Sequence, residues 1–328
     1  YAVSAETIRL FSTQIRIVED SLIIGFRIEL TPESPLFFGK AKSFNDNERF
    51  FRNMDDHSSS DNLKIPFMFK PIDKIIVRNI GQGSWNELVS NNKIILAFDF
   101  GTSYTTKKND VRKLIGNREV EYQISYPILI LSHWDVDHYH FLLAFSDVTI
   151  KSIFIFVYRS AIPNLTSRKA LGRFRILNKN ALLAIPCYSP NTIPSFPQKF
   201  YFPGISSIII YNANKSRSKN KSGIALVVRR KKICFIFPGD YDYTQISKYI
   251  LPDLNYACQH YLNVPHHGGK AGNFIYDISG KNIPINAVIS VGKNPYGHPN
   301  QKNIMELKKK GFRVVRTDVM HGDYSINI

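Results

Sequence analysis

Six consecutive residues near the middle of the chain carry four side chains of metal-ligand type. The segment His133-Trp-Asp135-Val-Asp137-His138 supplies two imidazoles and two carboxylates, and it follows the apolar run 126–131. An apolar run of that length is typical of a buried strand. Loops after the strands of α/β sheets are where such proteins place their chemistry. The sequence therefore predicts an α/β fold in which a strand ends at a site for divalent cations.

Three later segments place further candidate site residues after apolar runs. They are Phe237-Pro-Gly-Asp240, Val264-Pro-His266-His267-Gly-Gly and Asn294-Pro-Tyr296-Gly-His298-Pro. Upstream, the glycine-rich turn 79–84 precedes an apolar run that ends in Asp99-Phe-Gly101. Strands that end on one edge of a sheet bring their following loops together, so we expect these widely separated residues to converge.

The pattern of apolar runs predicts alternating strands and helices across most of the chain. Strands are expected at 74–79, 93–100, 126–131, 153–157, 205–211, 224–228, 233–237, 261–264, 287–291 and 313–315, and helices at 137–145 and 300–310. The polar segment 45–62 is typical of a linker. We therefore expect an N-terminal extension with a linker over residues 1–70 and one large domain over residues 71–328.

Taken in order, the motifs resemble the metallo-β-lactamase superfamily, whose first metal motif is His-x-His-x-Asp-His. Asp135 stands at the second His position, as is usual in the hydrolase domains of ComEC-type competence proteins and in phosphorylcholine esterases. The resemblance covers roughly residues 75–328 and rests on five ordered matches. It implies a four-layer αββα sandwich with a small N-terminal extension.

The resemblance also implies two divalent metal ions, zinc or manganese. The residues that match metal ligands are His133, Asp135, Asp137, His138, Asp240 and His267. His133 and Asp135 would hold one ion, Asp137 and His138 the other, and Asp240 would bridge the two. Either His266 or His267 would complete the second set, and His267, next to a glycine, is the better match.

One departure from the superfamily affects the first ion. No histidine lies between His140 and Asp240, so the usual middle histidine is missing. The first ion would then depend on His133, Asp135, Asp240 and water or another oxygen ligand. Such an oxygen-rich set favours Mn²⁺ more than a three-histidine set does, although zinc also fits.

Catalytic and substrate-binding roles follow from the same resemblance. Asp137, His266 and His298 are the expected catalytic residues, and His298 would protonate the leaving group or bind a phosphate oxygen. The expected substrate-binding residues are Tyr296, His298, Lys215, Arg217 and Lys219.

Charge favours a polyanionic partner. The net charge is +17, yet residues 1–70 carry nine basic and ten acidic residues, so the excess lies downstream. Residues 148–239 contain sixteen basic residues and no acidic one. A field of this kind attracts nucleic acid, although a charged stretch also serves solubility alone.

Three functions remain open on the sequence. The first is a phosphodiesterase or nuclease that uses a metal-bound hydroxide on DNA or RNA. The second is a hydrolase of a small phosphodiester, such as a nucleotide signal or a phosphocholine-type group, and the third is a catalytically weak nucleic-acid-binding module. Three cysteines without close pairing and no apolar stretch of about 18 residues favour a cytoplasmic protein without a membrane span.

Overall fold

The computed structural model describes residues 71–185, 198–202, 206–212, 222–254, 258–276 and 283–328. The predicted extension and linker, residues 1–70, lie outside the described residues, as do Lys215, Arg217 and Lys219. Their predicted roles stay predictions.

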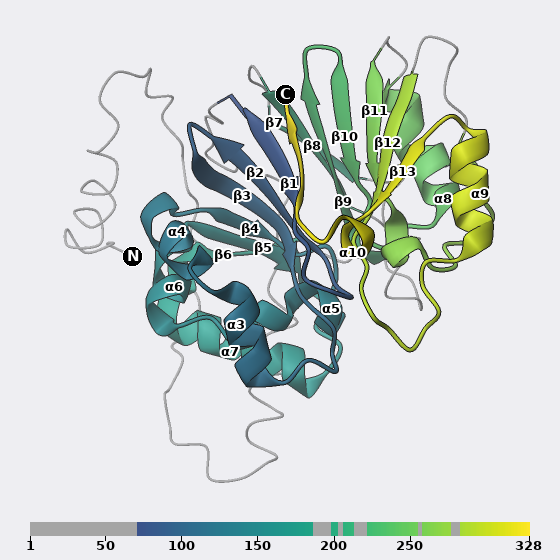
Figure 1. Ribbon diagram of the computed structural model, residues 1–328. Coiled ribbons are helices and arrows are strands. Elements are labelled where there is room, and N and C mark those ends of the chain that lie inside the picture. Colours follow the sequence, from purple (N-terminus) through teal and green to yellow (C-terminus); the bar gives the residue numbers. More distant parts are fainter. Residues whose placement is uncertain (1–70, 186–197, 203–205, 213–221, 255–257, 277–282) are drawn as a thin grey trace. The chain divides into compact units, whose positions relative to one another are not determined.

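Two seven-stranded sheets form the centre of the described part (Figure 1). The first sheet has the order β14-β1-β2-β3-β4-β5-β6. Its strands are β1 (Lys74–Val77), β2 (Trp85–Ser90), β3 (Lys93–Phe100), β4 (Ile128–Ile130), β5 (Ile155–Arg159), β6 (Leu182–Ile185) and β14 (Tyr324–Asn327). The second sheet has the order β13-β12-β11-β10-β9-β8-β7. Its strands are β7 (Gln198–Phe202), β8 (Ser206–Asn212), β9 (Ile224–Arg230), β10 (Ile233–Phe237), β11 (Gln259–Asn263), β12 (Ile283–Ile289) and β13 (Arg313–Arg316).

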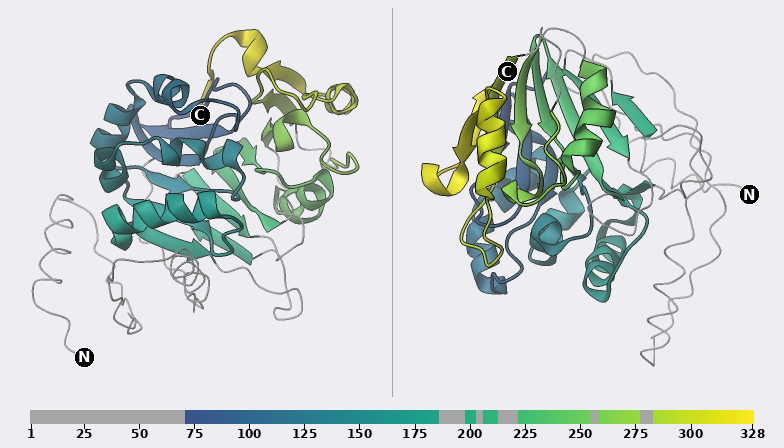
Figure 2. Two further views of the ribbon diagram at one scale, coloured as in Figure 1. Left: turned by 90° about the horizontal axis from the view of Figure 1, so that it is seen from below. Right: turned by 90° about the vertical axis from the view of Figure 1, so that its right-hand side faces the viewer.

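Helices cover the outer face of each sheet (Figures 1 and 2). On the first sheet they are α3 (Lys108–Ile115), α4 (Arg118–Ser125), α6 (Asp147–Ser152) and α7 (Leu165–Asn178), and on the second sheet α8 (Tyr243–Gln245) and α9 (Gln301–Lys309). The one-turn helices α5 (Val136–Tyr139) and α10 (Thr317–Met320) lie in loops at strand ends. This arrangement confirms the predicted αββα sandwich.

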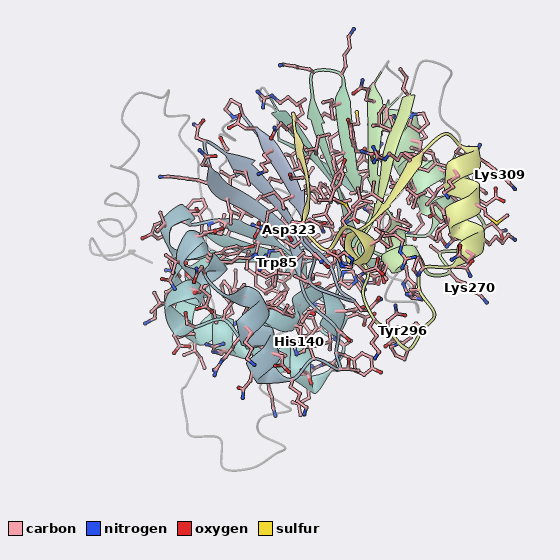
Figure 3. The ribbon with its side chains drawn as sticks, in the orientation of Figure 1. Trp85, His140, Lys270, Tyr296, Lys309 and Asp323 are labelled. Atoms are coloured by element: carbon pink, nitrogen blue, oxygen red, sulfur yellow. The ribbon has the colours of Figure 1, made fainter. Side chains whose placement is uncertain are left out.

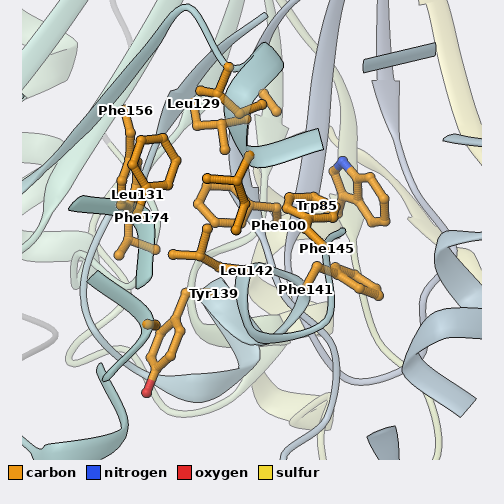
Figure 4. Close-up of a cluster of buried hydrophobic side chains, with 14 of the residues drawn as sticks. Trp85, Phe100, Leu129, Leu131, Tyr139, Phe141, Leu142, Phe145, Phe156 and Phe174 are labelled. Carbon is orange, nitrogen blue, oxygen red and sulfur yellow. The ribbon is translucent and has the colours of Figure 1, made fainter. Parts of the chain in front are cut away.

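Successive side chains of a strand point to opposite faces of its sheet, and here both faces are apolar, so each sheet packs on a neighbouring layer on both sides. In β10, Phe235 and Phe237 belong to the core between the two sheets, whereas Cys234 and Ile236 face the helices of the second sheet. A strand with both faces buried has large side chains at every position, each contributing about 1.5–3 kcal/mol. Another hydrophobic core lies between the first sheet and its helices. It is rich in aromatic rings, including Trp85, Phe100 and Phe156 (Figure 4).

Strand direction brings the candidate ligands together. Strands β3, β4 and β5 are parallel neighbours in the first sheet, and β10, β11 and β12 are parallel neighbours in the second. The loops after β3 and β4 therefore lie at one edge of their sheet, and those after β10, β11 and β12 lie at one edge of theirs. All the predicted ligands lie in these loops.

The predicted helix 137–145 is shorter than expected. Helix α5 ends at Tyr139 and a 3-10 helix continues over His140–Leu143. The Asp137 carbonyl accepts a hydrogen bond from the Ser84 N–H at 2.9 Å, which ties this turn to the neighbouring loop instead of to a continuing α-helix. Conversely, α7 lies within the acid-free basic stretch, where no helix was expected.

Two cysteines meet although their sequence spacing predicts no pairing. Cys234 in β10 and Cys258, just before β11, are buried with their Sγ atoms 3.0 Å apart. Parallel pairing of β10 with β11 brings them side by side. Among the residues that the structure describes, no helix combines the length and apolar character needed to cross a bilayer.

Candidate metal centre

The first sheet fixes one histidine through a buried carboxylate. Asp99, near the end of β3, is fully buried and adopts a left-handed backbone conformation with φ 57°. Its Oδ1 accepts a hydrogen bond from the Ser132 N–H at 2.7 Å, and its Oδ2 accepts one from His138 Nδ1 at 2.8 Å. A histidine that donates from Nδ1 presents Nε2 as its metal-binding atom.

His133 faces carboxylates from both sheets. Its Nε2 lies 3.4 Å from Asp135 Oδ2 and 3.5 Å from Asp240 Oδ2. Its Nδ1 lies 3.0 Å from the Ser132 hydroxyl. The side chain of His133 is 4% exposed, so these carboxylates provide its polar surroundings in place of solvent.

Asp240 reaches the centre from the second sheet through a tight turn. Gly239 has φ 57°, and a Cβ built on it would lie 2.8 Å from the Ser132 Cβ. Only glycine allows this close approach without a shift of either loop. Asp240 Oδ1 then lies 3.3 Å from His138 Nε2.

The adjacent histidines after β11 point to different partners. His266 and His267 both have positive φ, 53° and 51°, which is costly for residues other than glycine and is typical of functional sites. His267 Nδ1 donates to the Ser290 carbonyl at 2.9 Å, and its Nε2 lies 3.3 Å from Asp137 Oδ2. His266 Nδ1 donates to Asp240 Oδ2 at 2.8 Å.

Two groups of residues have the geometry of a cation site. In His133–His138–Asp240, and in Asp137–His138–His267, one ligand atom from each residue lies within 4.8 Å of the others. The Nε2 atoms of His133, His138 and His267 are buried and make no hydrogen bond within the described part of the chain. Leaving buried nitrogens unbonded is costly, and three of them beside carboxylates fit a divalent cation such as Zn²⁺ or Mn²⁺.

The charges of the centre also favour a cation. Burial raises the pKa of Asp137, but His267 and His138 outweigh it and lower the pKa to about 2. The pKa of Asp240 likewise lies well below its ordinary value because His138 and His133 outweigh burial. Burial and His138 lower the pKa of His133, but Asp240 and Asp135 raise it to about 9. His133 thus holds a proton beside ionised carboxylates, at a position where a cation could replace that proton.

The structure brings together five of the six predicted ligands. Asp135 lies beside His133, but it belongs to neither compact group and its side chain is 33% exposed. His138 belongs to both groups, yet one imidazole nitrogen binds one cation. His138 can therefore bind a cation either with His133 and Asp240 or with Asp137 and His267. Bridging of two cations by Asp240 stays a prediction.

The other predicted site residues form a row of rings beside the centre. The ring centroids of His266 and His298 lie 5.3 Å apart, and those of His298 and Tyr296 lie 5.5 Å apart. Gly269 has no room for a side chain, since a Cβ would lie 2.4 Å from His298 Nε2. Burial, followed by His266 and His267, lowers the pKa of His298 to about 4. His298 is therefore neutral at pH 7 in the described protein.

Two groups that contribute to the centre, Asp99 and Ser290, are not among the predicted site residues. The sequence marks Asp99 only as part of a strand-Asp-Gly pattern. A carboxylate at the end of an apolar strand was the available signal for Asp99, because a buried carboxylate requires a partner. The Ser290 contact uses a backbone carbonyl, which every residue carries, so no sequence signal existed.

Comparisons with known proteins give one partial match in sequence. No protein-family model matches the chain. ComE operon protein 3 from Bacillus subtilis (strain 168) is 34% identical over 107 residues, which are 31% of this chain and 13% of that protein. The chain therefore spans a small part of the length of the curated relative that it matches.

The solved structures that match this chain have low sequence identity to it. The metallo-β-lactamase fold protein YhfI from Bacillus subtilis is 13% identical with a TM-score of 0.44, over 78% of this chain and 100% of that one. The short form of human tRNase Z is 11% identical with a TM-score of 0.33, over 57% of this chain and 76% of that one. Within the described residues, this chain has two mixed sheets covered by helices.

Proposed function

We propose that the protein is a metal-dependent phosphodiesterase of the ComEC-type branch that hydrolyses nucleic acid. The observation that carries the proposal is the set of three buried Nε2 atoms, on His133, His138 and His267, that face carboxylates and make no hydrogen bond within the described residues. The partial identity to ComE operon protein 3 supports the branch. The net charge of +17 supports a polyanionic substrate.

Divalent cations held by these residues would supply Lewis acidity toward a phosphoryl oxygen. The chain itself orients the site: Asp99 sets the ring of His138, and the Ser290 carbonyl sets the ring of His267. His298 lies beside the centre as a neutral imidazole, which can donate a hydrogen bond to a phosphate oxygen or accept one from water. His266, held by Asp240, lies against the ring of His298.

The proposal is tested by cleavage of labelled single- and double-stranded DNA and RNA with added Mn²⁺, Zn²⁺ or Mg²⁺. We expect cleavage by the wild type and a loss of at least about 100-fold in Asp137→Ala, because a ligand is removed. Asp110→Ala serves as the matched control, since that carboxylate lies exposed on α3 and pairs only with Lys113 among the described residues. Cleavage that is equal in wild type and Asp137→Ala would sink the proposal. If the protein hydrolyses small phosphodiesters but no nucleic acid, the proposed substrate class is wrong and small phosphodiesters take its place.

A further inference from the structure

Two exposed tyrosine rings lie at the outer end of the row of rings that leads to the candidate metal centre. Tyr104 lies in the loop between β3 and α3. Tyr296 lies in the loop between β12 and α9 (Figure 3). Their side chains are 55% and 52% exposed, and their ring centroids lie 6.2 Å apart with the planes inclined at 49°. The loops come from different sheets, so the pair joins the two halves of the sandwich.

The pair is connected to the site by contacts between rings. Tyr296 lies against His298, His298 lies against His266, and His266 donates to the Asp240 carboxylate. Burial and Tyr104, followed by the charges of Asp137 and Asp135, raise the pKa of Tyr296 to about 12.

Both loops are held in place by hydrogen bonds that leave the rings outside. Asn294 Oδ1 accepts from the N–H groups of Tyr296 and His298 at 3.1 and 3.0 Å, and Asn294 Nδ2 donates to the His298 carbonyl at 3.0 Å. On the other side, Thr102 Oγ1 donates to the Ile80 carbonyl at 2.6 Å, and Thr102 itself is buried. A ring on a fixed loop loses little entropy when it binds a ligand.

We propose that Tyr104 and Tyr296 form a stacking surface for a nucleobase next to the scissile phosphate, and that Tyr104 determines specificity for phosphodiesters that carry a base. The proposal rests on the proposed function. The two rings already contact each other, so the base stacks on an exposed ring face and not between them. A quaternary ammonium group also binds aromatic faces, but a chain of net charge +17 favours an anionic partner over a cationic one.

Kinetics on paired substrates test this specificity. The substrates are two oligonucleotides of equal length and phosphate count, one with bases and one built of abasic tetrahydrofuran units. Stacking on aromatic side chains predicts that Tyr104→Ala raises KM for the base-bearing strand about 10- to 100-fold, with little change in kcat or in cleavage of the abasic strand. Tyr104→Phe keeps the ring and should retain the wild-type KM.

The control is Tyr126→Ala, because Tyr126 is 63% exposed and lies before β4, at the opposite end of that strand from the centre. An equal loss on both strands, or none on either, overturns the specificity role of Tyr104. Loss of phosphocholine-ester hydrolysis in Tyr104→Ala, with oligonucleotide kinetics unchanged, also overturns it and assigns the rings to a quaternary ammonium group.

A binding measurement separates this inference from the proposed function. Wild type and Tyr104→Ala are titrated into an oligonucleotide that contains 2-aminopurine, whose fluorescence is quenched when the base stacks. We expect quenching by the wild type and a Kd about 10- to 100-fold higher for Tyr104→Ala. If quenching depends on Tyr104 while no strand is cleaved, the proposed function fails and the stacking surface stands. If the two proteins quench equally, the stacking surface fails whatever is cleaved.

Discussion

At the scale of single residues, the centre depends on carboxylates that fix the histidines. Asp99 is fully buried and bonds both the Ser132 N–H and His138 Nδ1, so it sets the ring orientation and the tautomer of His138. Asp240 lies within 3.5 Å of ring nitrogens of His133, His138 and His266. The first residue orients a candidate ligand, and the second is a candidate ligand itself, so their substitutions should have different effects.

Asp99→Asn should weaken metal binding while the protein stays folded. Asparagine tolerates the left-handed backbone at this position, and its carbonyl oxygen can still accept from Ser132. The loss of the negative charge beside His138 should reduce Zn²⁺ or Mn²⁺ affinity about 10- to 100-fold in a calorimetric titration. An affinity equal to that of the wild type would show that Asp99 has no part in metal binding.

Asp240→Ala should remove about half of the bound metal or more, together with most activity, because several candidate ligands face this carboxylate. Elemental analysis of the purified variant gives the metal content directly. Unchanged metal content would refute the role of Asp240 as a ligand.

At the scale of elements, glycines allow loops from separate strands to come close. A Cβ on Gly101, after β3, would lie 2.3 Å from the carbonyl carbon and oxygen of Asp137 in α5. A Cβ on Gly83, before β2, would lie 2.5 Å from the backbone of Gly101 and Thr102. The loops around β2, β3 and α5 are therefore packed backbone to backbone, which holds Asp137 and His138 in position.

Gly101→Ala should displace α5 and so affect both stability and metal binding. Overpacking of this kind costs about 1–3 kcal/mol, and the displaced ligands should bind the cation more weakly. Thermal unfolding and metal titration measure the two effects. Gly322→Ala is the matched control, since its nearest atom would lie 3.9 Å away. A Gly101→Ala protein with the Tm and metal affinity of the control would contradict this account.

At the scale of the whole described fold, each sheet supplies part of the centre. His133, Asp137 and His138 follow β4 of the first sheet, whereas Asp240 and His267 follow β10 and β11 of the second. A cation bound between them would link the two sheets and would bind the native state only. Metal binding should therefore stabilise the protein.

Removal of metal should lower the Tm. At a free metal concentration about 1,000 times the Kd, binding contributes about 4 kcal/mol, which corresponds to a decrease of roughly 8–16 °C on chelation for a domain of this size. Scanning calorimetry with and without EDTA measures the decrease, and Asp240→Ala should show a smaller one. Equal Tm values for the wild type in both conditions would argue against a cation between the sheets.

Local patterns allowed much of this protein to be predicted. The apolar runs predicted β3 and β10 with their observed bounds, because a buried strand is a run of consecutive apolar residues. Strands β2, β6, β7 and β14 were not predicted, and β12 begins four residues earlier than expected. The cluster from His133 to His138 was predicted because metal binding requires particular side-chain types, and Asp240 and His267 were added by the resemblance to the metallo-β-lactamase superfamily. The short helix α5 was not predicted, since its end depends on a hydrogen bond from the distant Ser84.

Contacts between distant segments were decided only by the tertiary structure. The partners of His266 and His267 differ although the two residues are adjacent and alike, because Asp240 and the Ser290 carbonyl approach from different loops. Tyr104 meets Tyr296 across nearly two hundred residues, and no local pattern distinguishes it from an ordinary surface tyrosine. The sequence by itself determined which residue types and strands are present. Only the packing of the two sheets determined which side chains face one another, because that depends on loops whose ends are brought together by the whole core.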